Sequence, residues 1–131
     1  MVESTDEGVE FSGGFNYGCF AMRDKLSKVP QERRYQELIG HTDHRFPRGK
    51  GRKWLQLALD PNMGIEYYPD LFALFQVFPL AVDKTLVKLT TYSPPKLSAE
   101  ERELQAINLA LLDEVNDQDK MLVERIQRGV N

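Results

Sequence analysis

The chain has 131 residues, of which 41% are hydrophobic and 28% are charged, the composition of an ordinary globular domain. With 17 basic against 20 acidic residues its net charge is −3, which argues against a nucleic acid or an anionic membrane as main partner. No apolar run reaches the roughly 18 residues of a membrane span, and the acidic start does not resemble a signal peptide. A single cysteine excludes an internal disulfide. We therefore expect a cytoplasmic protein.

The first third of the chain is polar and only partly regular. Residues 1–8 are expected to be a disordered acidic N-terminus, and residues 9–131 to form a single domain. Aromatic residues and glycines over 9–22 favour a strand with a bulge. A short helix is predicted around Gln31 to Ile39. The basic stretch 45–53 is predicted to be a solvated loop rather than an anion site, because no aromatic residues are interleaved with its charges.

The middle of the chain predicts several strands with tight connections. Residues 53–59 alternate as a strand does, and Pro61-Asn62 and Pro69-Asp70 are turn signals. The apolar run 71–80 is expected to be buried on both faces or packed under a helix. Residues 85–92 are rich in β-branched side chains, which favour strand. Together these segments indicate an antiparallel meander.

The last third is predicted to be helical. Ser98 and Glu101 form a capping box, and apolar residues follow at steps of three and four as far as residue 126. Asn116 is expected to cap a second helical segment after a break or bend near Val115. Strands followed by helix predict an α+β fold, with an antiparallel sheet packed on a long C-terminal helix.

One acidic residue lies on the apolar stripe of that helix. The spacings of Asp119 from Val115, Leu122 and Ile126 place its carboxylate on the apolar face. A buried carboxylate must be paired, protonated or bound to a metal. Alternatively, Asn116 and Asp119 form a capping pair in the first turn of a helix. The spacing alone favours the capping alternative.

The stretch N-D-Q-D-K-M-L-V-E-R-I-Q-R-G resembles the end of the catalytic domain of Rieske-type non-haem iron oxygenases, the large (alpha) subunits of ring-hydroxylating enzymes. The family's last helix carries an acid, then Glu, Gln and Gly at fixed intervals. Asp119, Glu124, Gln127 and Gly129 match that order. Upstream, the Pro-Asn turn and FPLAVDKTLVKLTTYSP resemble a strand pair of the family, so the resemblance covers roughly residues 53–130.

The resemblance implies a partial START-like helix-grip fold and a dioxygen-dependent oxidation of an apolar or aromatic small molecule. It implies that Asp119 is the carboxylate of a two-histidine, one-carboxylate triad that holds a mononuclear Fe(II). Glu124 and Gln127 inherit no ligand role. Four apolar residues are expected to line a pocket or, as strand spacing favours, to pack in the core: Phe72, Phe75, Val77 and Leu89.

The chain also departs from the family. A Rieske cluster needs two cysteines, and Cys19 stands alone, so no such cluster is expected in this chain. His41 and His44 have two residues between them where the family has four. On a helical turn this pair could bind metal, but two solvent-exposed histidines are favoured. Cys19 is expected to be a buried, inert thiol. The chain is therefore expected to be the C-terminal part of an oxygenase catalytic domain, incomplete on its own.

Two other functions remain open. One is a non-catalytic helix-grip module that binds a small apolar ligand, with Asp119 merely capping its helix. The other is a subunit whose missing histidines come from a partner chain. An apolar face left open by a missing half would also favour association into a homo-oligomer. Neither a nucleic acid nor a membrane is expected as partner.

Overall fold

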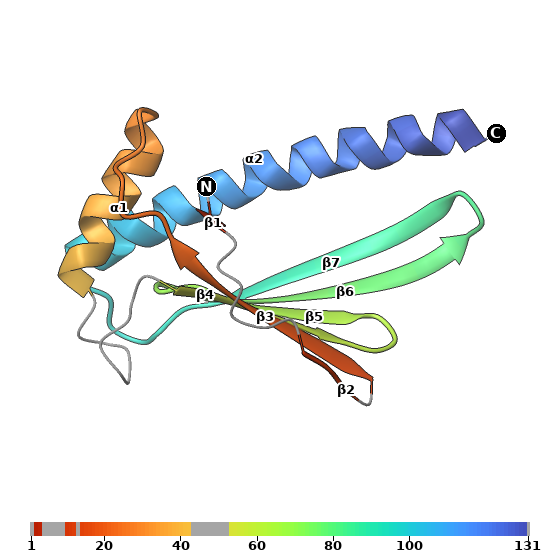
Figure 1. Cartoon of the computed structure of the whole chain (residues 1–131), viewed down its shortest axis with the longest axis horizontal. Coiled ribbons are helices and arrows are strands. Elements are labelled where there is room, and N and C mark those ends of the chain that lie inside the picture. The colour runs from red at the N-terminus through yellow and green to blue at the C-terminus, as the bar shows by residue number, and fades with distance from the viewer. Residues whose placement is uncertain (1, 4–9, 13, 43–52, 131) are drawn as a thin grey trace.

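The computed structural model describes residues 2–3, 10–12, 14–42 and 53–130. These residues form one antiparallel sheet with two helices on one of its sides (Figure 1). The predicted α+β class is confirmed, and so is the antiparallel sheet beside a long C-terminal helix. None of the helices described is long and apolar enough to cross a membrane.

The described part of the sheet has seven strands in the order β1-β3-β4-β5-β6-β7, with β2 paired to β3, and every pair is antiparallel. Their bounds are β1 (Val2–Glu3), β2 (Glu10–Ser12), β3 (Phe15–Met22), β4 (Lys53–Leu59), β5 (Met63–Tyr67), β6 (Phe72–Ala81) and β7 (Lys84–Tyr92). From β4 to β7 each strand pairs with the next along the chain, so the predicted meander is confirmed.

The N-terminal strands differ in detail from the prediction. The strand expected over 9–22 is two strands, β2 and β3, and Gly14 between them has a positive φ of 92° that favours glycine. Residues 2 and 3 pair with Met22 and Ala21 of β3, and the disorder expected over 1–8 stays a prediction. Residues 1 and 4–8 lie outside the described part of the chain.

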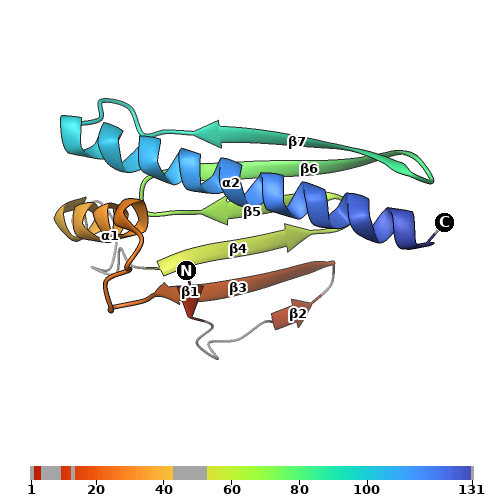
Figure 2. The ribbon, with the colours of Figure 1, turned by 90° about the horizontal axis from the view of Figure 1, so that it is seen from above.

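Two environments were expected for 71–80, and of these burial on both faces is wrong, whereas a helix does lie over one side of the strand (Figures 1 and 2). Within β6 only Ala73 is fully buried, and the end of the strand from Pro79 to Ala81 is exposed. The physical reason is that both helices lie on the same side of the sheet, so the other side of β6 has no described layer against it (Figures 1 and 2).

The two helices are α1 (Pro30–Thr42) and α2 (Ala99–Val130). The predicted capping box is confirmed, since the Ser98 amide donates to Glu101 Oε2 at 2.6 Å and the Glu101 amide donates to Ser98 Oγ at 3.2 Å. The predicted break near Val115 is wrong, because α2 is continuous. One Asn in a helix costs less than about 1 kcal/mol, and neither Gly nor Pro interrupts the segment before Gly129.

The core lies where the two helices meet at one end of the sheet. Tyr35, Leu38 and Ile39 of α1 pack with Leu104 of α2, and Met22 of β3 packs against this cluster. Since strand side chains alternate in direction, Met22 identifies which residues of each strand point toward the helices. We call that side of the sheet the helix side and the opposite one the outer side. Register-paired residues share a side, so Gln56, Glu66, Ala73 and Thr91 all belong to the helix side.

Candidate functional site

Helix α2 lies in two environments. Its N-terminal half is anchored, with Leu104 and Asn108 buried. Its Cα atoms come within 8 Å of Cα atoms of α1, but not of those of any described strand. Its C-terminal half presents six apolar side chains that are each more than half exposed: Val115, Met121, Leu122, Val123, Ile126 and Val130. The second half therefore offers an open apolar face.

Asp119 lies in this open half. It follows Asn108 by eleven residues, close to three helical turns, so the two side chains share a face of α2. The placement of Asp119 on the apolar stripe thus follows from the geometry, yet the residue and its neighbours Val115 and Leu122 are exposed. The alternative that Asn116 and Asp119 cap a helix is wrong, because α2 has no end near them.

His41 does not lie beside Asp119. His41 is near the end of α1, and its Nδ1 is 3.7 Å from Glu100 Oε2 in the first turn of α2. At a rise of 1.5 Å per residue, Glu100 and Asp119 are about 28 Å apart along the helix. His44 and the basic residues from 45 to 52 lie outside the described residues. Among the residues described, no group of three or more His, Cys, Asp or Glu side chains is placed to hold a metal ion.

A buried polar cluster fastens α2 to the sheet. Asp70, in the turn between β5 and β6, accepts a hydrogen bond from the Tyr35 hydroxyl at 2.8 Å and bonds from Asn108 Nδ2 at 2.9 and 3.1 Å. Gln105 Nε2 donates to the backbone oxygen of Asp70 at 3.2 Å. One carboxylate thus joins α1, α2 and the β5–β6 turn.

Burial changes the ionisation of this cluster. It raises the pKa of Asp70 to about 6, although the hydrogen bonds from Tyr35 and Asn108 act in the opposite direction. The pKa of Tyr35 is raised well above its ordinary value, first by burial and then by the neighbouring carboxylate. A neutral Asp70 is favoured in this environment. Above about pH 6 the carboxyl is mostly ionised, and its buried charge then lowers the stability of the fold.

Sequence reasoning treated Asp70 only as part of a turn and did not single out Tyr35 or Asn108. A signal for Asn108 was present: it lies on the apolar stripe, four residues after Leu104 and three before Leu111. A polar side chain in that position needs a buried partner. Nothing in the sequence indicated that the partner would be Asp70.

The helix side of the sheet carries both polar and apolar groups. The Tyr68 hydroxyl donates to Glu66 Oε2 at 3.0 Å, and burial raises the pKa of Glu66. Trp54 stacks on Tyr68 with ring centroids 5.7 Å apart, and its Nε1 is buried without an acceptor among the described residues. Further along the strands, the alternation places three of the predicted lining residues on this side: Phe75, Val77 and Leu89.

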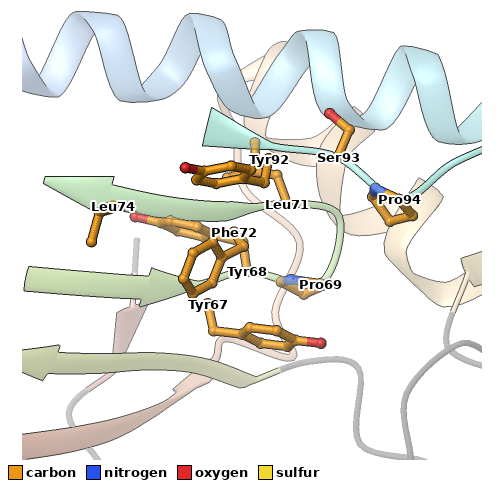
Figure 3. A pocket seen from close by; sticks show the side chains of 9 residues that line it. All are labelled: Tyr67, Tyr68, Pro69, Leu71, Phe72, Leu74, Tyr92, Ser93 and Pro94. Carbon is orange, nitrogen blue, oxygen red and sulfur yellow. The ribbon is translucent and has the colours of Figure 1, made fainter. Parts of the chain in front are cut away.

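A hollow of about 500 Å³ lies on the outer side of the sheet (Figure 3). Phe72, Leu74 and Tyr92 form its strand-borne wall, and the turn after β7 contributes Ser93 and Pro94. The Phe72 ring lies 5.7 Å from that of Tyr92, centroid to centroid. Of the four predicted lining residues, Phe72 alone lines this hollow. Cys19 of β3 also points to the outer side and is half-buried rather than buried.

The described residues thus form an antiparallel sheet with two helices on one side, and the second half of α2 carries Asp119 on an open apolar face. The family model for the ring hydroxylating alpha subunit (catalytic domain) matches residues 3–131, and the chain belongs to that family. The expected resemblance is thus confirmed, and it extends over nearly the whole chain rather than from residue 53 onward. No curated protein and no solved structure matches the chain.

Proposed function

We propose that the chain is part of the catalytic domain of a dioxygen-dependent ring-hydroxylating oxygenase, and that Asp119 is its carboxylate iron ligand. The observation that carries the proposal is the position of Asp119 on the open apolar face of α2 in a chain of this family. The family consists of non-haem iron oxygenases. When bound, such an iron activates dioxygen for oxidation of an aromatic or apolar small molecule.

The described residues do not fit an iron ion by themselves. Near Asp119 they bring one carboxylate and no imidazole, whereas a facial triad needs two histidines as well. In this proposal the imidazoles come from beyond the described residues, either from His44 or from a partner chain. The part of this chain is to carry the carboxylate on a continuous helix, among apolar neighbours.

The apolar wall of the substrate pocket is assigned to the helix side of β6 and β7. Phe75, Val77 and Leu89 lie on that side, and Leu89 remains 42% exposed. Leu122 and Ile126 of α2 carry the same apolar character on the helix. We propose that these two surfaces bound the pocket in a START-like helix-grip arrangement. We propose that the protein itself is a cytoplasmic homo-oligomer.

A second candidate function is supported by the hollow in Figure 3. Its wall is built from Phe72, Leu74 and Tyr92, and its volume of about 500 Å³ lies within the usual range for small-molecule sites. In this alternative the chain binds a small apolar ligand without chemistry, and Asp119 has no role in binding.

An anaerobic Fe(II) titration of the purified chain by calorimetry separates the two functions. The variants are Asp119→Ala, Asp117→Ala and a double His41→Ala/His44→Ala. Asp117 is a matched control, since it is an exposed carboxylate on the same helix but points away from the apolar stripe.

If Asp119 is the ligand, saturable Fe(II) binding is lost in Asp119→Ala and kept in Asp117→Ala. The double histidine variant then shows whether the chain supplies its own imidazoles or needs a partner. Equal binding by Asp119→Ala and Asp117→Ala would contradict the assignment. A wild-type chain that binds no Fe(II), but takes up an aromatic ligand unaffected by Asp119→Ala, would favour the binding module.

A further inference from the structure

Gly64 of β5 and Phe75 of β6 meet on the helix side of the sheet. The two residues are register partners, and a Cβ atom added to Gly64 would overlap with three carbon atoms of the Phe75 ring. The ring therefore lies across Gly64, which is buried between the half-buried Met63 and Ile65. Even an alanine at position 64 would have to displace this ring.

The backbone does not require a glycine at this position. Among the described glycines, Gly14 has a positive φ and Gly64 does not. A glycine inside a strand weakens it, because it has no side chain to pack and loses more conformational freedom on folding than other residues do. The close approach of the Phe75 ring is the feature of the structure that explains Gly64.

The second face of the Phe75 ring has no aromatic partner. Elsewhere on this side, Phe20 packs on Trp54 with ring centroids 4.9 Å apart. Among the described residues, no second aromatic ring contacts Phe75, and its side chain is half-buried. Because one face of the ring lies on Gly64, the other face points away from the sheet, toward the side on which α2 lies.

Phe75 lies below the open half of α2 rather than the anchored half. Both α2 and β6 lead away from the Asp70 cluster in the same direction (Figures 1 and 2). Phe75 is three residues beyond Phe72, the start of β6, or roughly 10 Å along the strand. Asp119 is eleven residues beyond Asn108, or roughly 16 Å along the helix. Both therefore lie beyond the anchor, where α2 leaves its apolar face open.

We propose that Gly64 and Phe75 together determine which substrates the site accepts: the Phe75 ring, lying across Gly64, is the surface on which an aromatic ring of the substrate stacks. This inference rests on the proposed function, since it needs a substrate between α2 and the sheet. A contact between two aromatic rings contributes about 0.5–1.5 kcal/mol beyond the area that it buries. A flat substrate therefore gains more from Phe75 than a saturated one of similar size. A side chain at position 64 would move the ring toward α2 and reduce the space for the substrate.

The test is calorimetric binding of two probes to the metal-free chain: 2-naphthol, which is flat, and 2-decalol, which has the same carbon skeleton in saturated form. Wild type should bind 2-naphthol roughly five-fold more tightly than 2-decalol, or better. Gly64→Ala should weaken 2-naphthol binding roughly ten-fold, as overpacking does. In a Phe75→Ala background the same substitution should change the affinity by less than about two-fold, because no ring remains for the new methyl group to displace.

Two further variants separate a change in the site from a general loss of folding. Gly18→Ala is the matched control, because a Cβ atom at Gly18 would lie 2.7 Å from the Phe20 ring on the same side of the sheet. That ring packs on Trp54, so Gly18→Ala should leave the binding of both probes unchanged. Phe75→Leu keeps an apolar side chain and needs no change at position 64. It should abolish the preference for 2-naphthol, and it provides the test even if Gly64→Ala does not fold.

A wild-type chain that binds neither probe, or binds both equally well, would overturn the proposal. Equal effects of Gly64→Ala in the wild-type and Phe75→Ala backgrounds would also overturn it. So would a loss of 2-naphthol binding in Tyr92→Ala, which would locate the probe in the outer hollow (Figure 3). The probes are titrated without iron, whereas the assignment of Asp119 is tested by Fe(II) binding, so either experiment can fail while the other succeeds.

Discussion

The two halves of α2 have the same sequence pattern and different surroundings. In the first half, apolar residues at steps of three and four lie against α1, and Asn108 bonds to the buried Asp70. In the second half, the same spacing continues through Leu122 and Ile126, yet both side chains are more than half exposed. The capping box and the Asp70 cluster hold the first half, and no comparable contact is found among the described residues of the second (Figure 1).

The comparison teaches that an apolar stripe predicts a helix and its inward face, but not what that face meets. Most of the stability of a protein helix comes from the packing of its apolar face. The first half of α2 gains this from α1, while the second half keeps its apolar face open around Asp119. This open apolar face is the feature on which the proposed iron site at Asp119 rests.

The largest expected difference between the halves is in side-chain truncation. Leu104→Ala removes a side chain that is 1% exposed and should lower the free energy of unfolding by about 2–5 kcal/mol. Leu122→Ala, on the open half, should change it by less than about 0.5 kcal/mol. Urea unfolding followed by circular dichroism measures both. Similar losses in the two variants would show that the second half is packed as tightly as the first.

The Asp70 cluster should make the anchored half sensitive to pH. Burial raises the pKa of Asp70 from its ordinary 3.8 to about 6 in the fold, so the folded state holds this proton more tightly than the unfolded chain does. Its contribution to stability is complete below about pH 4 and is lost as the pH rises through 6. Two units correspond to roughly 3 kcal/mol.

The measurement is urea unfolding at a series of pH values from 4 to 7, with wild type and Asp70→Asn. Asp70→Asn removes the titrating group and should flatten most of the slope; Glu66, whose pKa is also raised by burial, accounts for the remainder. A slope that is the same in Asp70→Asn would mean that Asp70 does not titrate in this window.

The capping box should contribute a smaller amount. Ser98→Ala removes the acceptor of the Glu101 amide and should destabilise α2 by about 1 kcal/mol. Thermal unfolding of wild type and variant measures this loss. Ser93→Ala is a control, because Ser93 lies outside the helix. A control that loses as much stability as Ser98→Ala would argue against the cap.

The smallest expected effect tests whether α2 is continuous, because a continuous helix and a capped break predict opposite signs for the change in stability. Since Asn116 lies within an unbroken helix and is exposed, Asn116→Ala should stabilise the fold by about 0.5 kcal/mol, the gain in helix propensity. A cap at this position would instead lose about 1 kcal/mol on the same substitution. Thermal unfolding distinguishes the two. A loss of stability in Asn116→Ala would indicate a cap at Asn116, and hence a break near Val115.

Local signals predicted much of this fold. Turn residues at Pro61-Asn62, alternation in the strands and the Ser98–Glu101 pair each act within a few residues, and the elements they predict are present. What could not be predicted depends on distant partners. The Asp70–Asn108 pair joins residues 38 apart. The outer side of the sheet is open because both helices lie on its other side. Whether Asp119 binds a metal also depends on residues elsewhere, and it stays a prediction.

Amide hydrogen exchange resolved along α2, with and without Fe(II), tests most directly whether one half anchors the fold and the other serves a site. The account predicts strong protection up to about residue 112 and faster exchange beyond it. Fe(II) should slow exchange around Asp119 in the wild type and leave Asp119→Ala unchanged. Uniform protection along α2, together with no response to Fe(II) near Asp119, would contradict it.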